Sequence, residues 1–516
     1  MDAISRRSLI AGAAGITALP RLAAAQPAPA RRGGVLRISV DQAVDVLNPL
    51  LTRVNPEYLV SELLYSNLTR LKPDMTAEPD LAQSWSANAA LTEWTFVLRE
   101  GLVFHDGSPC TAADVVATFK AILDPKTASA GRTNVGPITG VEARDTRTAV
   151  FHLAAGYADL PVAVAYTNAR IIPARFAGGD LARLSRMAVG TGPFTLVSYE
   201  PDRQVVVARN PHYYDSARPY LDRVEVLVFP DPVAQASALI SGEIDMSANT
   251  DPSEYPRFMH ARGVKALRVA SGQFLNVNMR CDQKPFSDPR VREALALTVD
   301  RTAMVGFVAQ GYGTPGNDTP LSPAYHFYKS LPLRKPDIAR ARQLLAEAGH
   351  PGGLDLSLVA SDTPGTRTQL GVALQAMAKP AGFRINVQTM PQATYLAQVW
   401  RKGSFYVGFY NMQATADAIF SLLYTSDSAW NETHWDNAAF DKLVAAARVT
   451  TNEAQRRTLY GQAQALMHDQ IPSVIPVFFD LLAGERTYVR GYQLHPRGAV
   501  FRLDYVWLGH GAPVRR

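Results

Sequence analysis

The stretch GTGPFTLVSYEPDRQVVVARNPHYYD, residues 190–215, is the part of this chain that says most about its fold. Gly190 and Gly192 predict a close approach between two backbone segments, because glycine has no Cβ atom to hold them apart. Residues 194–199 and 203–209 alternate between apolar and polar side chains, which predicts the two strands of a hairpin. The Asn-Pro pair that follows then ends the second strand.

Two further segments continue this pattern toward the C-terminus. RPYLDRVEVLVFPD, residues 218–231, contains a predicted strand over residues 224–229. ALISGEIDM, residues 238–246, follows it, and the apolar run over residues 234–240 predicts a short helix that ends at Gly242. None of these segments contains a nucleophile with a neighbouring base.

Taken together, these segments resemble the extracytoplasmic solute-binding proteins of peptide-type ABC transporters, often called solute-binding protein family 5. Further blocks similar to that family follow in the expected order: LAQSWSANAALTEWTFVLREGLVFHDGSPCTAADVVATF (81–119), NVNMRCDQKPFSDPRVREALALTVDR (276–301), WNETHWDNAAFDKLVAAAR (430–448) and LYGQAQALMHDQIPSVIPVF (459–478). The resemblance therefore covers most of the chain.

The resemblance implies an α/β fold of the two-lobed periplasmic binding protein type, with an enlarged first lobe and a ligand cleft between the lobes. Length agrees with two lobes, because roughly 490 residues beyond an export signal exceed the ~250–300 at which one core stops growing. We expect a signal peptide over 1–25, the first lobe with an extra subdomain over 26–272, the second lobe over 273–481, and a return to the first lobe over 482–516.

The function that the resemblance implies is capture and delivery, with no bond made or broken. The expected protein is a monomeric periplasmic receptor of an ABC importer, which takes a peptide or a related small amino-bearing solute to the permease subunits. No catalytic residue, cofactor or bound metal is expected. A metal-chelate or other small-metabolite binding protein on the same scaffold is the main alternative, and an exported hydrolase is a further one.

The N-terminal residues predict export from the cytoplasm. Arg6-Arg7 precedes an apolar run over residues 11–19 and the small residues 23–25. The paired arginines favour the twin-arginine route, and a general secretory signal is the alternative. The run is far shorter than the ~20 residues of a membrane span, and no cysteine marks a lipid-anchoring site. A periplasmic protein without a membrane anchor is therefore predicted.

Charge and cysteine content exclude several other classes. The formal net charge is only +6, and no long run of Lys or Arg with interleaved aromatic residues indicates a nucleic-acid surface. In a protein of this resemblance, Cys110 begins a first-lobe helix and Cys281 follows the crossing into the second lobe. We expect them not to pair, because a disulfide needs Cα atoms within ~7 Å. Two cysteines and no HExxH pattern also give no zinc site.

Several helices are predicted from the residues at their ends. Thr111 and Asp114 match a capping box ahead of an apolar helical face. Asp288, followed by a proline in the first turn, predicts a second helix start. Pro336 is expected to open a third helix, which Gly349 ends. These faces are expected to serve packing.

Asp417 is the predicted ligand contact. In peptide-binding relatives this region carries an Asp-Pro pair whose carboxylate receives the ligand's α-ammonium, and the pair here is Asp417-Ala418. A carboxylate accepts several charge-assisted hydrogen bonds, which are about twice as strong as neutral ones. The alternative is that Asp417 caps a helix over residues 418–424.

Two neighbouring segments are the other candidates for the cleft wall. Residues 411–415 are expected to offer backbone groups to an extended ligand, although the tryptophan common in relatives is absent here. Trp435 is a candidate from a second loop, with a packing role in the core as its alternative. The full set of candidate contacts is Asn411, Met412, Gln413, Ala414, Thr415, Asp417, Trp430, Asn431, Glu432 and Trp435.

Two other features argue against a short-peptide ligand and against catalysis. A peptide carboxylate calls for an arginine fork, yet the loop over residues 359–365 has none, and Arg367 on the following helix is the nearest. This leaves room for amino-acid derivatives, opines, cationic metabolites or a chelated metal. His105-Asp106 suggests a base with its orienting acid, but adjacent residues on an extended chain point apart, so a structural turn is predicted.

Overall fold

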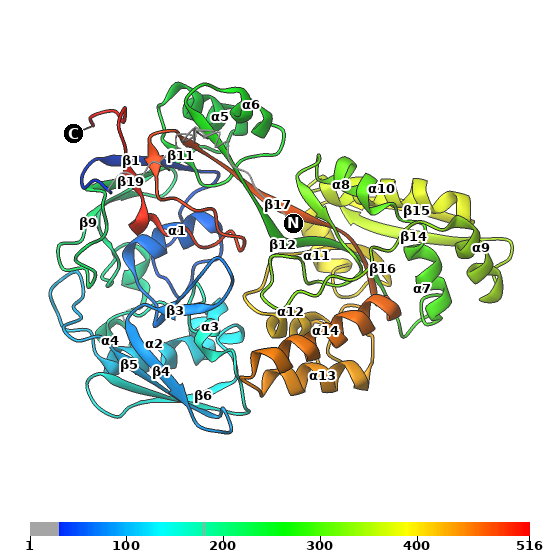
Figure 1. The fold of residues 1–516 in the computed structure, drawn as a ribbon, viewed down its shortest axis with the longest axis horizontal. Helices are drawn as coiled ribbons and strands as arrows, with labels where there is room; N and C mark the ends of the chain where they lie inside the picture. Colours follow the sequence, from blue (N-terminus) through cyan, green and yellow to red (C-terminus); the bar gives the residue numbers. More distant parts are fainter. Residues whose placement is uncertain (1–29, 178, 180, 516) are drawn as a thin grey trace, which may run out of the picture.

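A computed structural model describes residues 30–177, 179 and 181–515 of the 516-residue chain, so the predicted export signal lies outside the described residues. Two lobes are joined by two long strands, β12 (Val264–Met279) and β17 (Ser473–Arg486), which run side by side between them (Figure 1). These strands are antiparallel, and their pairing shifts register between Ala270 and Gln273. Among the described residues, no helix has the length and apolar character needed to cross a membrane.

One large mixed sheet extends through both lobes. Its strands lie in the order β15-β14-β16-β12-β17-β11-β1-β10-β9-β8, and β13 pairs with β17. The remaining bounds are β1 (Val35–Val40), β8 (Phe194–Glu200), β9 (Gln204–Arg209), β10 (Arg223–Val228), β11 (Met246–Ser247), β13 (Gly313–Pro315), β14 (Leu354–Ser361), β15 (Phe383–Met390) and β16 (Phe405–Tyr410).

In its described residues, the first lobe adds a four-stranded sheet, two short strand pairs and six α-helices. The sheet has the order β4-β5-β7-β6. The elements are α1 (Asn55–Leu64), β2 (Thr69–Leu71), β3 (Ala77–Pro79), β4 (Ala82–Ala87), β5 (Glu93–Leu98), α2 (Ala112–Leu123), β6 (Ile138–Ala143), β7 (Thr148–Leu153), α3 (Leu160–Ala163), α4 (Ala174–Ala177), α5 (Pro232–Ser241), α6 (Tyr255–His260), β18 (Val489–Arg490) and β19 (Trp507–Leu508).

Helices make up most of the second lobe outside the large sheet. They are α7 (Pro289–Ala296), α8 (Arg301–Val308), α9 (Ile338–Glu347), α10 (Thr366–Ala378), α11 (Gln392–Gln398), α12 (Ala416–Leu423), α13 (Ala438–Arg448) and α14 (Glu453–Gln470). Short 3-10 helices lie at Pro125–Thr127, Ala130–Thr133, Leu181–Ser185, Lys379–Ala381 and Leu503–Tyr505.

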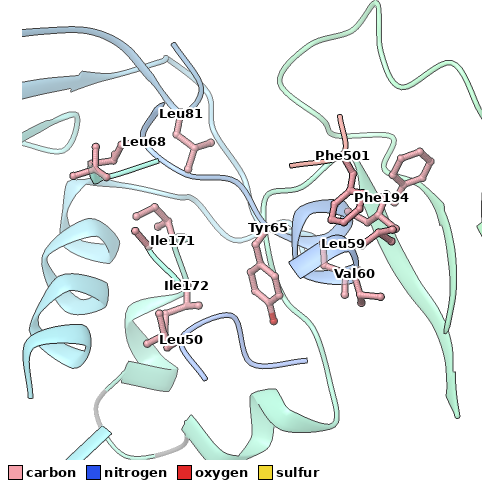
Figure 2. Close-up of a cluster of buried hydrophobic side chains, with 14 of the residues drawn as sticks. Leu50, Leu59, Val60, Tyr65, Leu68, Leu81, Ile171, Ile172, Phe194 and Phe501 are labelled. Atoms are coloured by element: carbon pink, nitrogen blue, oxygen red, sulfur yellow. The ribbon is translucent and has the colours of Figure 1, made fainter. Parts of the chain in front are cut away.

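The hairpin predicted from residues 190–215 is confirmed. Strands β8 and β9 pair antiparallel from Phe194 opposite Arg209 onward. A Cβ atom placed on Gly192 would lie 2.4 Å from the backbone carbon of Leu64, which explains the glycine. Chain segments that are distant in sequence share this core, and Figure 2 shows Leu59 of α1 in the same cluster as Phe194 and Phe501.

The predicted helix ends are largely confirmed. The capping box of Thr111 and Asp114 opens α2, and the Asp288 side chain accepts a hydrogen bond from a backbone N–H in the first turn of α7. Gly242 ends α5 in the left-handed conformation. The third helix begins slightly later than predicted, because Asp337 and not Pro336 is the N-cap of α9.

Candidate ligand-binding site

Three cavities lie where residues of the two lobes face one another. The first has a volume of about 310 Å³, and we call it the Asp417 cavity. Its described walls are Thr133, Asn134, Gly136, Pro137, Ala155, Tyr157, Val162, Ala163 and Tyr166 from the first lobe, and Gln413, Ala414, Thr415, Asp417, Ala418, Ser421, Leu422, Ser428 and Arg448 from the second. Asp417 and Arg448 are the charged residues among these described walls.

Two more cavities share the same interface. One of about 450 Å³ lies along β12 and β17 and is lined by residues such as Gln273, Phe409, Asp480 and Tyr492. The other, of about 260 Å³, adjoins the Asp417 cavity, since Thr415 lines both. Cavities therefore lie at more than one place along the interface between the lobes.

Asp417 occupies the first turn of α12, although it does not cap that helix. Thr415 is the N-cap, and its hydroxyl accepts a hydrogen bond from the backbone N–H of Ala418 at 3.0 Å. The capping alternative for Asp417 is therefore wrong, because the helix starts earlier than residue 418. Its side chain is thus available for the cavity that it lines.

The Asp417 carboxylate has one engaged oxygen and one available oxygen. Oδ1 accepts hydrogen bonds from Arg448 Nε at 3.0 Å and from Ser421 Oγ at 3.3 Å. Oδ2 receives no hydrogen bond from any described residue, and it is not among the buried atoms that lack a partner. Burial raises the pKa of Asp417, while the Arg448 guanidinium acts in the opposite direction. The ion pair therefore compensates a desolvated carboxylate in part.

Tyr157 faces this pair from the first lobe. It lines the same cavity, and its hydroxyl makes no hydrogen bond with a described residue. Burial, followed by the nearby charge of Asp417, raises the pKa of Tyr157 well above its ordinary value. The hydroxyl is therefore neutral at physiological pH and serves as a donor or acceptor.

Residues 411–415 divide between cavity and core. Gln413, Ala414 and Thr415 line the Asp417 cavity, and the backbone N–H of Gln413 donates to the Tyr325 hydroxyl. Asn411 accepts a hydrogen bond from Gln273, and Met412 is buried in an apolar cluster. Gln413 and Thr415 give this part of the cavity wall a polar character.

The loop with Trp430 and Trp435 packs mainly against its own lobe. Trp430 is partly exposed and meets the Trp400 ring edge-on, while Trp435 is buried against Phe440. Asn431 donates to two backbone carbonyls of the same loop. For Trp435 the structure shows the packing alternative.

Glu432 takes part in a buried polar network. Its carboxylate accepts hydrogen bonds from the side chains of Asn278 and Tyr410. Burial raises the pKa of Glu432, and these donors act to lower it. Glu432 is therefore already satisfied inside the second lobe and is not among the described walls of the three cavities.

Among three cations near the cleft, only Arg367 has a signal in the sequence, as the arginine nearest to the loop over residues 359–365. Arg448 ends α13 and reaches back to Asp417, which no local pattern shows. Arg367 is buried over the rings of Tyr395 and Phe409 and donates to Gln392 Oε1 at 2.6 Å. Arg497 lies 4.9 Å above the Tyr166 ring, and its Nε and Nη1 atoms are buried without a partner among the described residues.

The pair His105-Asp106 forms a structural turn, as predicted. His105 Nε2 lies 3.2 Å from the carbonyl of Gly192, and Asp106 pairs with Arg175. Burial lowers the pKa of His105 to about 4. Cys110 and Cys281 are both free. In the part of the chain that the structure describes, no three His, Cys, Asp or Glu side chains gather closely enough to hold a metal ion.

Residues 76–433 match "Bacterial extracellular solute-binding proteins, family 5 Middle". The chain belongs to this family. The family 5 protein is 28% identical to the "Probable deoxycholate-binding periplasmic protein YgiS" of Escherichia coli, with 96% of this chain and 98% of the relative covered. It is also 28% identical to the periplasmic oligopeptide-binding protein OppA of Salmonella typhimurium, with 95% and 96% covered.

Solved structures share the fold of this chain. The ABC transporter substrate-binding protein CtaP of Listeria monocytogenes superposes with a TM-score of 0.82 at 24% identity, over 93% of this family 5 protein and 100% of CtaP. The family model confirms the family resemblance, and the superposition confirms the two-lobed α/β fold predicted from the sequence. The relatives named above are binding proteins by their names.

Proposed function

We propose that this protein is the periplasmic substrate-binding receptor of an ABC importer and captures a peptide or a related small amino-bearing solute. The observation that carries this proposal is the Asp417 cavity, where the available Oδ2 of Asp417 and the hydroxyl of Tyr157 come from opposite lobes. An ammonium group donates three charge-assisted hydrogen bonds and therefore suits such a pair of acceptors. Gln413, Ala414 and Thr415 complete the proposed contact wall.

Closure of the lobes around the solute is part of this proposal. We place the crossings near residues 272 and 482, so that the first lobe comprises 26–272 and 482–516 and the second lobe 273–481. The register shift between Ala270 and Gln273 supports the first crossing, because an irregular pairing bends a strand pair more easily than a regular ladder. Solute groups that touch both lobes would favour the closed form that a permease recognises.

The relatives and the N-terminal sequence support the periplasm as the proposed place of action. Relatives such as the Salmonella typhimurium protein are named as periplasmic. We propose that residues 1–25 direct this chain to the same compartment through the twin-arginine route, and that the mature protein is a monomer that docks on the permease.

Native mass spectrometry of protein purified from the periplasm tests the function without any assumption about the solute. The expected result is an added mass that denaturation releases as a small amine-bearing compound. A metal with an organic chelator would instead support the metal-chelate alternative. Protein that carries no solute, and that no peptide, amino compound, opine or metal chelate stabilises in thermal-shift screens, would contradict the receptor function.

A further inference from the structure

The charged groups of the Asp417 cavity already neutralise each other. Asp417 and Arg448 are the two charged residues on its described walls, and they form an ion pair of 3.0 Å. The other polar side chains there, such as Asn134, Gln413 and Ser428, are uncharged. A lone ammonium that entered this cavity would therefore leave an uncompensated positive charge, which is costly in a partly desolvated site.

Both members of the pair keep an unused atom. Arg448 donates from Nε to Asp417 and from Nη2 to Ser421, whereas Nη1 has no hydrogen-bond partner among the described residues. Nη1 is also absent from the buried atoms that lack a partner, so it remains accessible. On the other side, Asp417 Oδ2 is available in the same way. The pair thus offers one acceptor and one donor to the same volume.

An amino-acid head group matches both free atoms. In such a head an ammonium and a carboxylate share one carbon atom, so a single head group can reach both members of an ion pair whose Nε and Oδ1 atoms are 3.0 Å apart. The head adds no net charge to the cavity, and both of its charges gain charge-assisted hydrogen bonds. An ordinary peptide N-terminus supplies the ammonium but presents an uncharged amide where the carboxylate would stand.

We propose that the Asp417–Arg448 pair selects solutes that carry a free amino-acid head group, with Asp417 receiving the ammonium and Arg448 receiving the adjacent carboxylate. This inference rests on the proposed function and narrows its solute class. Arg448 is more exposed than Asp417, with 32% against 5% of the side chain accessible, so the carboxylate lies on the more open side of the cavity. Tyr157 remains free to hydrogen-bond the ammonium from the first lobe.

Two isomeric dipeptides test this directly. In γ-glutamyl-alanine the ammonium and the α-carboxylate share a carbon atom, whereas in α-glutamyl-alanine the ammonium stands next to an amide, and the two compounds have equal mass and formal charge. We expect calorimetry to show that the γ isomer binds at least about tenfold more tightly. Equal binding, tighter binding of the α isomer, or binding of neither isomer would each overturn the proposal.

Variants of the arginine separate charge recognition from a structural role. Arg448→Met removes the carboxylate partner and leaves Asp417 unpaired, so the γ isomer weakens, the α isomer gains, and the preference reverses. Arg448→Lys keeps a positive charge and should retain part of the preference. Arg457→Met is the matched control, because Arg457 forms an exposed ion pair with Glu453 on α14. A preference that survives unchanged in Arg448→Met would contradict the role of Arg448.

The solute released in native mass spectrometry distinguishes failure of the head-group inference from failure of the proposed receptor function. A released amine without a neighbouring free carboxylate would overturn the head-group inference while the receptor function stands. A released compound with both groups on one carbon atom supports both. Protein that binds no solute in that experiment or in the thermal-shift screens contradicts the receptor function itself.

Discussion

Arg456 of α14 donates a hydrogen bond of 2.7 Å to the carboxylate of Asp159, which immediately precedes α3 in the other lobe. Both side chains are more than nine-tenths buried. The backbone N–H of Ala158 also donates to the carbonyl of Arg448 at 2.8 Å. These contacts join the lobes on the side of the cleft away from the long strands, as the position of α3 beside α13 and α14 in Figure 1 illustrates.

Removal of one partner of this ion pair should loosen the contact between the lobes. Arg456→Met leaves Asp159 buried and unpaired, which costs about 3–5 kcal/mol in comparable sites. We expect small-angle scattering to show a larger radius of gyration than in the wild-type protein, and solute affinity to fall. The double variant Asp159→Asn/Arg456→Met removes both charges and should recover part of the loss. Identical scattering curves for wild type and Arg456→Met would show that the pair does not hold the lobes together.

Asp417→Asn should weaken the binding of an ammonium-bearing solute and leave the fold intact. The fold is expected to survive because Thr415, and not Asp417, caps α12. Loss of a charged partner in a desolvated site corresponds to roughly 2–5 kcal/mol of binding free energy. Calorimetry with the solute recovered from the periplasm measures this loss. Asp441→Asn is the control, since this acid lies on α13 outside the walls of the Asp417 cavity, and unchanged affinity in Asp417→Asn would remove Asp417 from the site.

His495 should make the protein less stable in acid. Burial is the main cause of the lowered pKa of His495, which is about 4. Arg497 and Arg502 also lower this pKa, whereas the Lys72 carbonyl and Asp74 act to raise it. As the pH falls, the unfolded chain, with a histidine pKa near 6.5, binds this proton before the folded chain does. The free energy of unfolding therefore has its full value from this group above pH ~6.5 and decreases as the pH drops toward 4. The full effect of one such group is about 3 kcal/mol.

His495→Gln tests this pH dependence. Glutamine keeps an N–H donor for the Lys72 carbonyl, which His495 Nε2 contacts at 3.0 Å, but it cannot titrate. We expect the free energy of unfolding, measured by urea denaturation, to fall less between pH 7 and pH 5 in the variant than in the wild-type protein. Equal slopes would show that His495 does not contribute to the pH dependence, whatever the absolute stability of the variant.

Gly192→Ala should destabilise the first lobe. The new Cβ atom would lie 2.6 Å from the backbone oxygen of Leu63 and equally close to the backbone nitrogen of Tyr65, and backbone atoms cannot move aside as a flexible side chain does. A loss of about 3 kcal/mol is expected from such overpacking. Thermal and urea denaturation measure it, with Gly140→Ala as the control, because a Cβ atom there meets nothing within 4 Å. Similar stability of both variants would refute the role of close approach at Gly192.

Much of the local structure could be predicted because short-range rules decide it. The β8–β9 hairpin follows from alternation of side chains, and the start of α2 from the capping box of Thr111 and Asp114. The start of α12 could not be predicted as reliably, because Thr415 and Asp417 are both capping residue types two positions apart. The path of the chain from β16 into the helix selects Thr415 and leaves Asp417 in the cavity wall.

Sequence alone determined the family, the α/β class, most element ends and the candidate status of Asp417, because these depend on residue order and on contacts between near neighbours. The tertiary structure alone decided that Arg448 pairs with Asp417, that Tyr157 faces them from the other lobe, and that Glu432 and Trp435 are internal. Side chains far apart in sequence meet only after the lobes have folded and come together, and their charges then depend on burial. For that reason the composition of the site, and the solute class that we infer from it, became visible only in three dimensions.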